Sequence, residues 1–283
     1  MGRAALAPWL LGCGLRGAPP AQVARRVSGR TVVVTGASRG IGHEVALRLA
    51  GVGAHVVALG RSEGDLLELQ TACGRLAGSC DRLAFDLRDD LAAGEAAVTV
   101  LDRWGPPELI VANAGHSIHR SVAQTAGRWH DVDRLARLHY LGTLALMLPL
   151  LEGMMAAGSG HLLHVSSVSV DWPLPNWSTY TGSKAGLEAW LASAGPELAA
   201  AGVAVTSVHL PRVATAMSAP TAGLYHTPEL SVRQAADVVC RALVRRPRLV
   251  SPWWARVGAA LNGAGLGATH AAWTRLLRAG VSP

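Results

Sequence analysis

The stretch Thr35-Gly36-Ala37-Ser38-Arg39-Gly40-Ile41-Gly42 decides the fold of this 283-residue chain. It follows a short apolar run, residues 31–35, and leads into a segment of helical character. In a chain with 32 glycines, spaced glycines alone would indicate only a tight turn. Between a strand and a helix they let the backbone approach a pyrophosphate, whose charge the helix N-terminus stabilises. The expected dinucleotide contacts are Gly36, Ser38, Arg39, Gly40, Ile41 and Gly42.

The rest of the chain alternates short apolar runs with longer helical segments, the rhythm of βαβ units. Such runs are typical of strands that helices cover on both faces. Strands are expected at residues 31–35, 55–59, 82–85, 109–112, 161–166 and 203–209. Helices are expected to begin near Gly42, Glu63, Leu91, Trp129 and Ser183, with a later one from the cap Ser231 to about Arg245. The pattern predicts an α/β protein with a doubly wound parallel sheet, a Rossmann fold, in a single domain.

Three regions of the chain differ in character. Residues 29–250 hold the alternating pattern, and within them residues 211–230 are rich in Pro, Ala, Ser and Thr, which predicts a substrate lid loop. Residues 1–28 are expected to form an N-terminal extension; their apolar run precedes the arginines, the reverse of a secretory signal. The tail, residues 251–283, carries three tryptophans and is expected to pack on the core, meet a partner or touch a membrane surface peripherally.

Composition narrows the classes of function. Half of the residues are apolar and 16% are charged, which fits a packed globular protein. Arginine supplies 25 of the 26 basic side chains, so the net charge of +7 indicates composition bias and phosphate-bearing ligands rather than a nucleic-acid partner. Cys13, Cys73, Cys80 and Cys240 lack the short paired spacings of a metal site. We therefore expect no metal, reduced thiols and a cytoplasmic protein.

The end of the second expected strand indicates which dinucleotide binds. A carboxylate about 20 residues past the glycine loop would hold the ribose hydroxyl of NAD. The sequence there is Leu59-Gly60-Arg61-Ser62, and a basic residue suits the extra 2′-phosphate of NADP. Arg39 in the glycine loop could reach the same group. Either arginine alone could be an ordinary solvated charge, but their joint placement predicts NADP(H) as the cofactor.

Tyr180 and Lys184 are expected to carry the chemistry. They are four residues apart near the start of a helix, which places both side chains on one face. A phenol loses its proton near pH 10, and a nearby ammonium lowers that pKa. Lys184 is the only lysine of the chain, in a role that arginine fills poorly. Ser167, just past the fifth expected strand, is placed to hold a carbonyl oxygen, with Ser166 and Ser169 as competitors.

Together these motifs resemble the short-chain dehydrogenase/reductase family over about residues 30–250. The resemblance implies that Ser167 orients the substrate carbonyl, Tyr180 gives the proton and Lys184 binds the nicotinamide ribose. The cofactor contacts that we expect after the third, fourth and sixth strands are Asp86, Leu87, Asn113, Ala114, Gly115, Pro211, Val213 and Thr215. The family commonly has an asparagine that supports a proton-relaying water where this chain has His139. A histidine could hold such a water and titrate itself, or it could be a tolerated substitution.

Three loop segments carry a narrower resemblance. Residues 114–122, 216–221 and 230–248 are similar to the fatty acyl-CoA reductase branch of the family, which reduces acyl thioesters towards aldehydes. This resemblance implies a substrate that is apolar or linked to coenzyme A.

We therefore expect an NADPH-dependent reductase that delivers hydride to an acyl thioester, a fatty aldehyde or a long-chain ketone. The alternative is a ketoreductase or alcohol dehydrogenase of a small or secondary metabolite, with Trp172 and Trp177 either shaping its pocket or packing in the core. The third hypothesis, motivated by His139 and the tail, is a non-catalytic nucleotide-binding protein. Members of the family are often dimers or tetramers, so we also expect a homo-oligomer.

Overall fold

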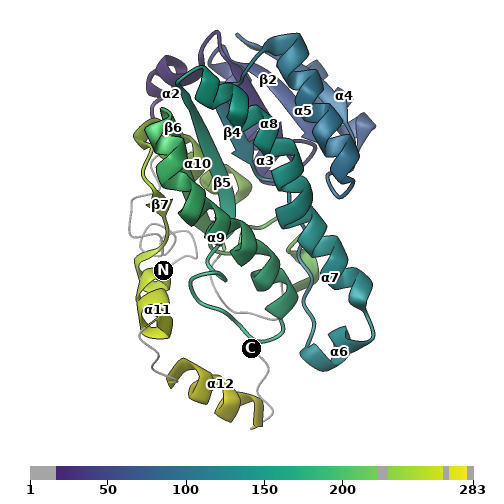
Figure 1. The fold of residues 1–283 in the computed structure, drawn as a ribbon, viewed down its shortest axis with the longest axis vertical. Coiled ribbons are helices and arrows are strands. Elements are labelled where there is room, and N and C mark those ends of the chain that lie inside the picture. The colour runs from purple at the N-terminus through teal and green to yellow at the C-terminus, as the bar shows by residue number, and fades with distance from the viewer. Residues whose placement is uncertain (1–16, 222–228, 264–267, 279–283) are drawn as a thin grey trace.

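The computed structural model describes residues 17–221, 229–263 and 268–278, and its centre is one parallel sheet of seven strands (Figure 1). The strand order is β3-β2-β1-β4-β5-β6-β7. The chain adds β2 and β3 on one side of β1 and then crosses over to add β4 to β7 on the other side, so the order of the strands reverses between β1 and β4. Ligands of doubly wound sheets bind at this reversal, beyond the carboxyl ends of the strands. The predicted fold is confirmed. The strands are β1 (Thr31–Thr35), β2 (His55–Gly60), β3 (Ser79–Ala84), β4 (Leu109–Ala112), β5 (Gly160–Ser167), β6 (Val203–Leu210) and β7 (Leu249–Val250).

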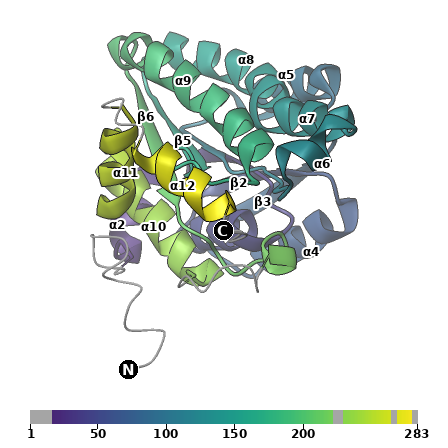
Figure 2. The same ribbon diagram turned by 90° about the horizontal axis from the view of Figure 1, so that it is seen from below.

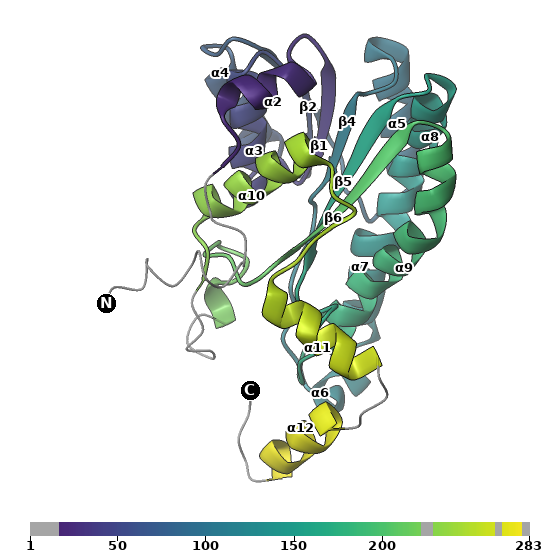
Figure 3. The same ribbon diagram turned by 90° about the vertical axis from the view of Figure 1, so that its left-hand side faces the viewer.

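Helices cover both faces of the sheet (Figure 3). One face carries α2 (Pro20–Val27), α3 (Gly40–Gly51), α4 (Glu63–Cys73) and α10 (Val232–Arg245). The other carries α5 (Asp90–Trp104), α8 (Gly142–Ala156) and α9 (Ser178–Ala200). Because both faces are covered, every residue of β4 is buried, which explains why central strands read as plain apolar runs.

A long helical stretch leads into α8. The short α6 (Val122–Ala126) precedes α7 (Trp129–Ala136), which continues through a π-helical turn, Arg137–Leu141, into α8. Among the described residues, Trp129–Ala156 alone is long and apolar enough to cross a membrane by length and composition. Its Leu146, Leu150 and Met154 are fully buried in the layer between the sheet and α5, so protein takes up this apolar face.

Three elements depart most from the prediction. β3 begins at Ser79 rather than at residue 82, because an edge strand pairs only with β2 and tolerates polar residues that hide it from an apolar pattern. α9 begins at Ser178, five residues before the predicted start at Ser183, so Tyr180 lies in its first turn. β7 was not predicted, since two residues at the opposite edge give no periodic signal.

The regions outside the central pattern also contain helices. Within the predicted N-terminal extension, α2 buries Val23 and Val27 in the core beside α10. The tail forms α11 (Trp253–Gly263) and α12 (Ala268–Arg278), at the end of the molecule where the strands have their carboxyl ends (Figures 1 and 2). The loop after β6 is closed by a bridge between Val213 and Leu230; residues 222–228 of the predicted lid lie outside the described part.

Candidate active site

The glycine loop forms a cradle at the end of β1. Gly36 and Gly40 have φ angles of +65° and +59°, which residues with a side chain rarely adopt. A Cβ atom at Gly42 would lie 2.3 Å from the Gly36 carbonyl oxygen and 2.6 Å from Asn113 Nδ2. Asn113 Nδ2 donates to the Thr35 carbonyl oxygen at 3.1 Å and so ties the loop to the end of β4. The close backbone approach, together with the open N-terminus of α3, fits the pyrophosphate of a dinucleotide.

The residues expected at the adenosine end gather beyond β2 and β3. A Cβ atom at Gly60 would lie 3.4 Å from Ser38 Oγ, and the neighbouring Arg61 is exposed. Arg39 is also exposed, but its Nε donates to Asp65 at 2.6 Å, so a phosphate would share this guanidinium with a carboxylate. Sequence reasoning missed that partner. Its only local signal was the position of Asp65 in the first turn of α4.

Asp86 and Leu87 follow β3, each with a distinct contact. Arg88 Nε donates to Asp86 Oδ1 at 2.9 Å, and this hydrogen bond keeps the pKa of the carboxyl below its usual value. A Cβ atom at Gly142 would lie 1.6 Å from the Leu87 carbonyl oxygen. Only glycine therefore allows α8 to start this close to the cofactor edge of the sheet.

The segment after β6 folds back over the glycine loop. A Cβ atom at Gly40 would lie 3.5 Å from Thr215 Cγ2. Ser218 Oγ donates to the Val213 carbonyl oxygen at 2.6 Å and accepts from the Thr215 amide at 3.1 Å, which fixes this turn. Thr215 therefore lies beside the glycine loop, and the same turn holds Val213; the predicted cofactor contacts of Pro211, Val213 and Thr215 stay a prediction.

Tyr180 and Ser167 meet at the ends of α9 and β5. Burial raises the pKa of Tyr180, and a hydrogen bond with Ser167 partly opposes the rise, so the phenol keeps its proton at neutral pH. Ser167 Oγ also accepts from the Ser169 amide at 3.1 Å. Ser167, rather than Ser166 or Ser169, thus contacts the tyrosine, and the pair can hold one carbonyl oxygen.

Lys184 lies one turn further along α9. Its Nζ donates to the Val165 carbonyl oxygen at 3.1 Å. Burial lowers the pKa of Lys184 to about 8, although the carboxylate of Glu188 opposes the fall. The expected lowering of the Tyr180 pKa by Lys184 is not seen, because burial dominates the environment of the phenol and the ammonium points to the strand.

His139 sits in the π-helical turn beside Tyr180, with ring centroids 5.6 Å apart. Its Nε2 accepts from the His116 amide at 3.0 Å, and its Nδ1 bonds Ser183 Oγ at 2.8 Å. Ser183 Oγ in turn donates to the Tyr180 carbonyl oxygen at 2.8 Å, so the ring proton belongs on Nδ1. Burial, and next the charge of Lys184, lower the pKa of His139 well below its usual value. Both nitrogens are thus engaged with protein atoms, which favours a positioning role over the expected water relay.

A buried polar network, which sequence reasoning missed, lies behind Lys184. Glu188 Oε1 accepts from His164 Nδ1 at 2.8 Å and lies 3.3 Å from His209 Nε2. His209 Nδ1 donates to Asp171 Oδ2 at 2.7 Å, and Ser251 Oγ, just before α11, donates to the same oxygen at 2.6 Å. We call Asp171, His209, Glu188 and His164 the buried network. The spacing of Glu188, four residues after Lys184 on one helix, was its one visible signal.

The two tryptophans between Ser167 and Tyr180 have different roles. The Trp177 ring lies 5.7 Å from that of Tyr180 and 5.1 Å from that of His119, so it lines the site. A Cβ atom at Gly258 would lie 2.0 Å from the Trp172 ring, so Trp172 packs beneath α11. Trp177 therefore shapes the substrate wall, and Trp172 serves the packing of the tail.

Comparison with known proteins agrees with this geometry. The model of the short chain dehydrogenase family matches residues 30–223, and the chain belongs to this family of oxidoreductases. A fatty acyl-CoA reductase of Acinetobacter baylyi is 33% identical over 225 residues, covering 80% of this chain and 76% of the relative. One of Mycobacterium tuberculosis is 34% identical over 247 residues, covering 86% and 82%. These relatives confirm the predicted likeness to the fatty acyl-CoA reductase branch.

A solved structure supports the same assignment. The crystal structure of a metagenomic short-chain oxidoreductase in complex with NADP is 28% identical, with a TM-score of 0.67. The match covers 77% of this chain and 92% of that one. The dinucleotide-binding fold of the two proteins is therefore shared over nearly the whole of the relative.

Proposed function

We propose that this protein is an NADPH-dependent reductase that delivers hydride to the carbonyl of an acyl thioester, a fatty aldehyde or a long-chain ketone. The observation that carries the proposal is the partly buried, protonated Tyr180 hydrogen-bonded to Ser167, one helical turn from the ammonium of Lys184. These groups lie beyond the carboxyl ends of the strands, where the glycine cradle also opens.

The side chains of the site have distinct tasks in the proposed reaction. Ser167 and Tyr180 hold the carbonyl oxygen, and Tyr180 gives it a proton as negative charge develops. Lys184, one helical turn further along α9, would hold the nicotinamide ribose of the cofactor. A bound NADPH supplies the hydride. With a thioester, addition of hydride and proton gives a hemithioacetal, which breaks down to an aldehyde and a free thiol.

A panel of substrates separates the candidate functions. NADPH consumption is measured with acyl thioesters, aldehydes and ketones of graded chain length. Both relatives are named fatty acyl-CoA reductases, which supports a preference for thioesters with long acyl chains. Preference for small ketones would favour the ketoreductase alternative, which the wall made by Trp177 also suits. Tight NADPH binding without turnover of any substrate would favour the non-catalytic hypothesis.

The choice of NADPH over NADH rests on the two arginines near the adenosine end. Arg61 follows β2 where a carboxylate would select NAD, and the related oxidoreductase contains NADP. Arg61→Asp is expected to weaken NADPH binding by about tenfold or more while changing NADH binding little. Equal effects on both cofactors, measured by fluorescence titration, would contradict a 2′-phosphate contact.

We propose that the two C-terminal helices contact an anionic membrane surface peripherally. Trp253, Val257 and Leu261 are exposed at four-residue spacing on α11, and Leu276 and Leu277 are exposed on α12. Seven arginines and no carboxylate side chain follow Asp237 in the sequence. Apolar stripes with basic flanks suit an interfacial helix. The test is co-sedimentation of the protein with vesicles that contain phosphatidylglycerol. Binding by wild type that is lost in V257E/L261E would support this contact. Equal recovery of wild type with neutral vesicles would contradict it.

We also propose a homo-oligomer in the cytoplasm. Leu141, Leu148 and Met155 are exposed at seven-residue spacing at and along α8, a stripe that a second copy could cover. The thiols of Cys73, Cys80 and Cys240 are free and buried, which fits a reducing compartment. Light scattering of wild type and Leu148→Glu tests the first statement, and fractionation of the native host tests the second.

A further inference from the structure

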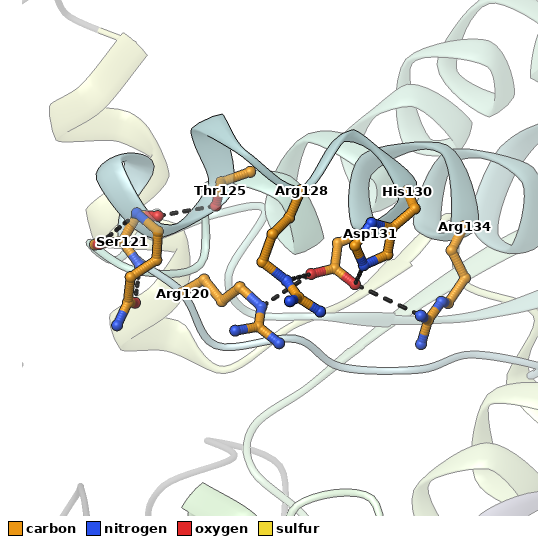
Figure 4. A network of polar contacts seen from close by, with 8 residues as sticks. Arg120, Ser121, Thr125, Arg128, His130, Asp131 and Arg134 are labelled. Atoms are coloured by element: carbon orange, nitrogen blue, oxygen red, sulfur yellow. Dashed lines mark hydrogen bonds and ion pairs between the residues drawn. The ribbon is translucent and has the colours of Figure 1, made fainter.

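Three arginines surround one buried carboxylate beside the active site (Figure 4). Arg120 Nε and Arg128 Nε lie 2.9 and 2.8 Å from Asp131 Oδ2, and Arg134 Nη2 lies 3.6 Å from Oδ1. The Asp131 side chain is 3% exposed, whereas the three arginines are 35 to 41% exposed. We call Arg120, Arg128 and Arg134 the arginine rim.

The arginine rim carries more positive charge than its carboxylate neutralises. The hydrogen bond from Arg128 lowers the pKa of Asp131, so the carboxylate stays ionised, and a formal surplus of two positive charges remains. Arg120 and Arg128 meet Asp131 through Nε, and their terminal nitrogens extend beyond it (Figure 4). Guanidinium groups presented in this way bind phosphate oxygens in pairs.

An exposed aromatic ring stands next to these charges. Trp129 follows Arg128 directly as the first residue of α7, and it is 75% exposed. The exposed ring offers a flat apolar face beside the guanidinium groups of the arginine rim. Purine bases stack on such rings, and cationic side chains beside them take the phosphates. The combination suits a phosphorylated adenosine.

The arginine rim lies on the substrate side of the site. The Arg120 amide donates to the Asn176 carbonyl oxygen at 2.7 Å, and the next residue, Trp177, meets the Tyr180 ring edge to face. Burial lowers the pKa of His116, and the positive charge of the nearby Arg134 lowers it further. The His116 amide donates a hydrogen bond to His139. The arginine rim follows β4, and the glycine cradle follows the neighbouring strand β1, so the two sites share the carboxyl edge of the sheet.

We propose that the arginine rim and Trp129 bind the phosphorylated adenosine diphosphate of a coenzyme A thioester, whose pantetheine arm passes Trp177 and brings the thioester carbonyl to Tyr180. This inference rests on the proposed reductase function and narrows its substrate from any long-chain carbonyl to a CoA thioester. It assigns substrate recognition to side chains that carry none of the chemistry.

Kinetics with two thioesters test the proposal. Dodecanoyl-CoA and dodecanoyl-N-acetylcysteamine share the acyl chain, but only the first carries the nucleotide. Trp129→Ala and Arg134→Gln change exposed side chains, so the fold should persist, and Arg137→Gln is the matched control because Arg137 pairs with Asp90 and Asp133. We expect the double variant to raise KM for dodecanoyl-CoA by about tenfold with kcat nearly unchanged, and to leave KM for the other thioester unaltered. Equal effects on the two thioesters, or none, would overturn the proposal.

A binding measurement separates this proposal from the reductase function itself. Adenosine 3′,5′-bisphosphate is titrated calorimetrically into protein saturated with NADPH, which keeps the glycine cradle filled. We expect binding to wild type and to Arg137→Gln, and about tenfold weaker binding to the double variant. No binding to wild type overturns the arginine-rim site even if thioesters are reduced. Binding without reduction of any thioester supports the site and overturns the proposed reaction.

Discussion

Two buried histidines flank Lys184 and end in opposite charge states. On one side, His139 in the π-helical turn meets an amide and a hydroxyl, and burial keeps it neutral. On the other, in the buried network, burial also disfavours the charge of His209, but the hydrogen bonds that His209 donates to Asp171 and Glu188 outweigh it and raise the pKa to about 9. Two buried imidazoles thus differ in protonation, because only carboxylate partners compensate the lost solvation.

The difference assigns separate tasks to the two sides of the lysine. The His139 side holds the backbone of Tyr180 through Ser183 without adding charge. The buried network keeps an ionised carboxylate, Glu188, one helical turn from the ammonium, and burial of Glu188 is outweighed by hydrogen bonds from His164 and His209 that lower its pKa. The neutral His139 side therefore fixes the position of Tyr180, and the charged network side stabilises the ammonium of Lys184.

Glu188→Gln should have the largest effect, because it removes the charge on which this comparison rests. The substitution leaves a protonated His209 without one of its partners, and we expect a loss of about 3 kcal/mol in the free energy of unfolding. Without the carboxylate, the pKa of Lys184 should fall further below 8, so activity should decline at lower pH than in wild type. The pH dependence of kcat measures this shift. If the variant loses stability but the decline of kcat at high pH stays where it is in wild type, Glu188 has a structural role only.

The sequence predicted the cofactor half of the molecule better than the region behind Lys184. A glycine loop between strand and helix is a local signal, and Asn113 and Thr215 reach it through motifs with fixed places in the family. The buried network joins side chains of β5, α9 and β6 and of the turn after β5, far apart in the sequence. Pairing at such separations depends on strand register, which a single sequence does not display. The arginine rim is hidden for a similar reason, because Arg120 joins Asp131 across a loop.

His209→Gln should have a similar effect on stability at low pH but no shift of the basic limb of activity, and the size of the stability effect depends on pH. Because folding raises the pKa of His209 from 6.5 to about 9, its contribution is complete below pH 6.5 and is lost as pH rises through 9. Wild type should therefore exceed the variant by about 3 kcal/mol at pH 6, a gap that shrinks towards pH 10. Denaturant unfolding at several pH values measures it. A gap that stays constant with pH would show that His209 is neutral in the folded protein.

His139→Asn should have the smallest effect and probes the neutral side. Asparagine loses part of the contact with the His116 amide and Ser183, at a cost of about 1 kcal/mol in stability. We expect kcat to fall by less than about tenfold with an unchanged pH profile, since a group that stays neutral adds no titration. A pH–rate profile recorded beside that of Glu188→Gln checks this. Loss of a titrating limb in His139→Asn would restore the proton-relay role.

The central claim, that Tyr180 protonates the reduced carbonyl, is tested most directly by Tyr180→Phe. The measurement is single-turnover oxidation of NADPH with dodecanal, together with the Kd of NADPH for each protein. Removing the only hydroxyl that donates the proton should lower the rate by about 10² to 10⁴, while the Kd stays within about threefold. A variant that turns over at the wild-type rate with normal cofactor affinity would contradict the account.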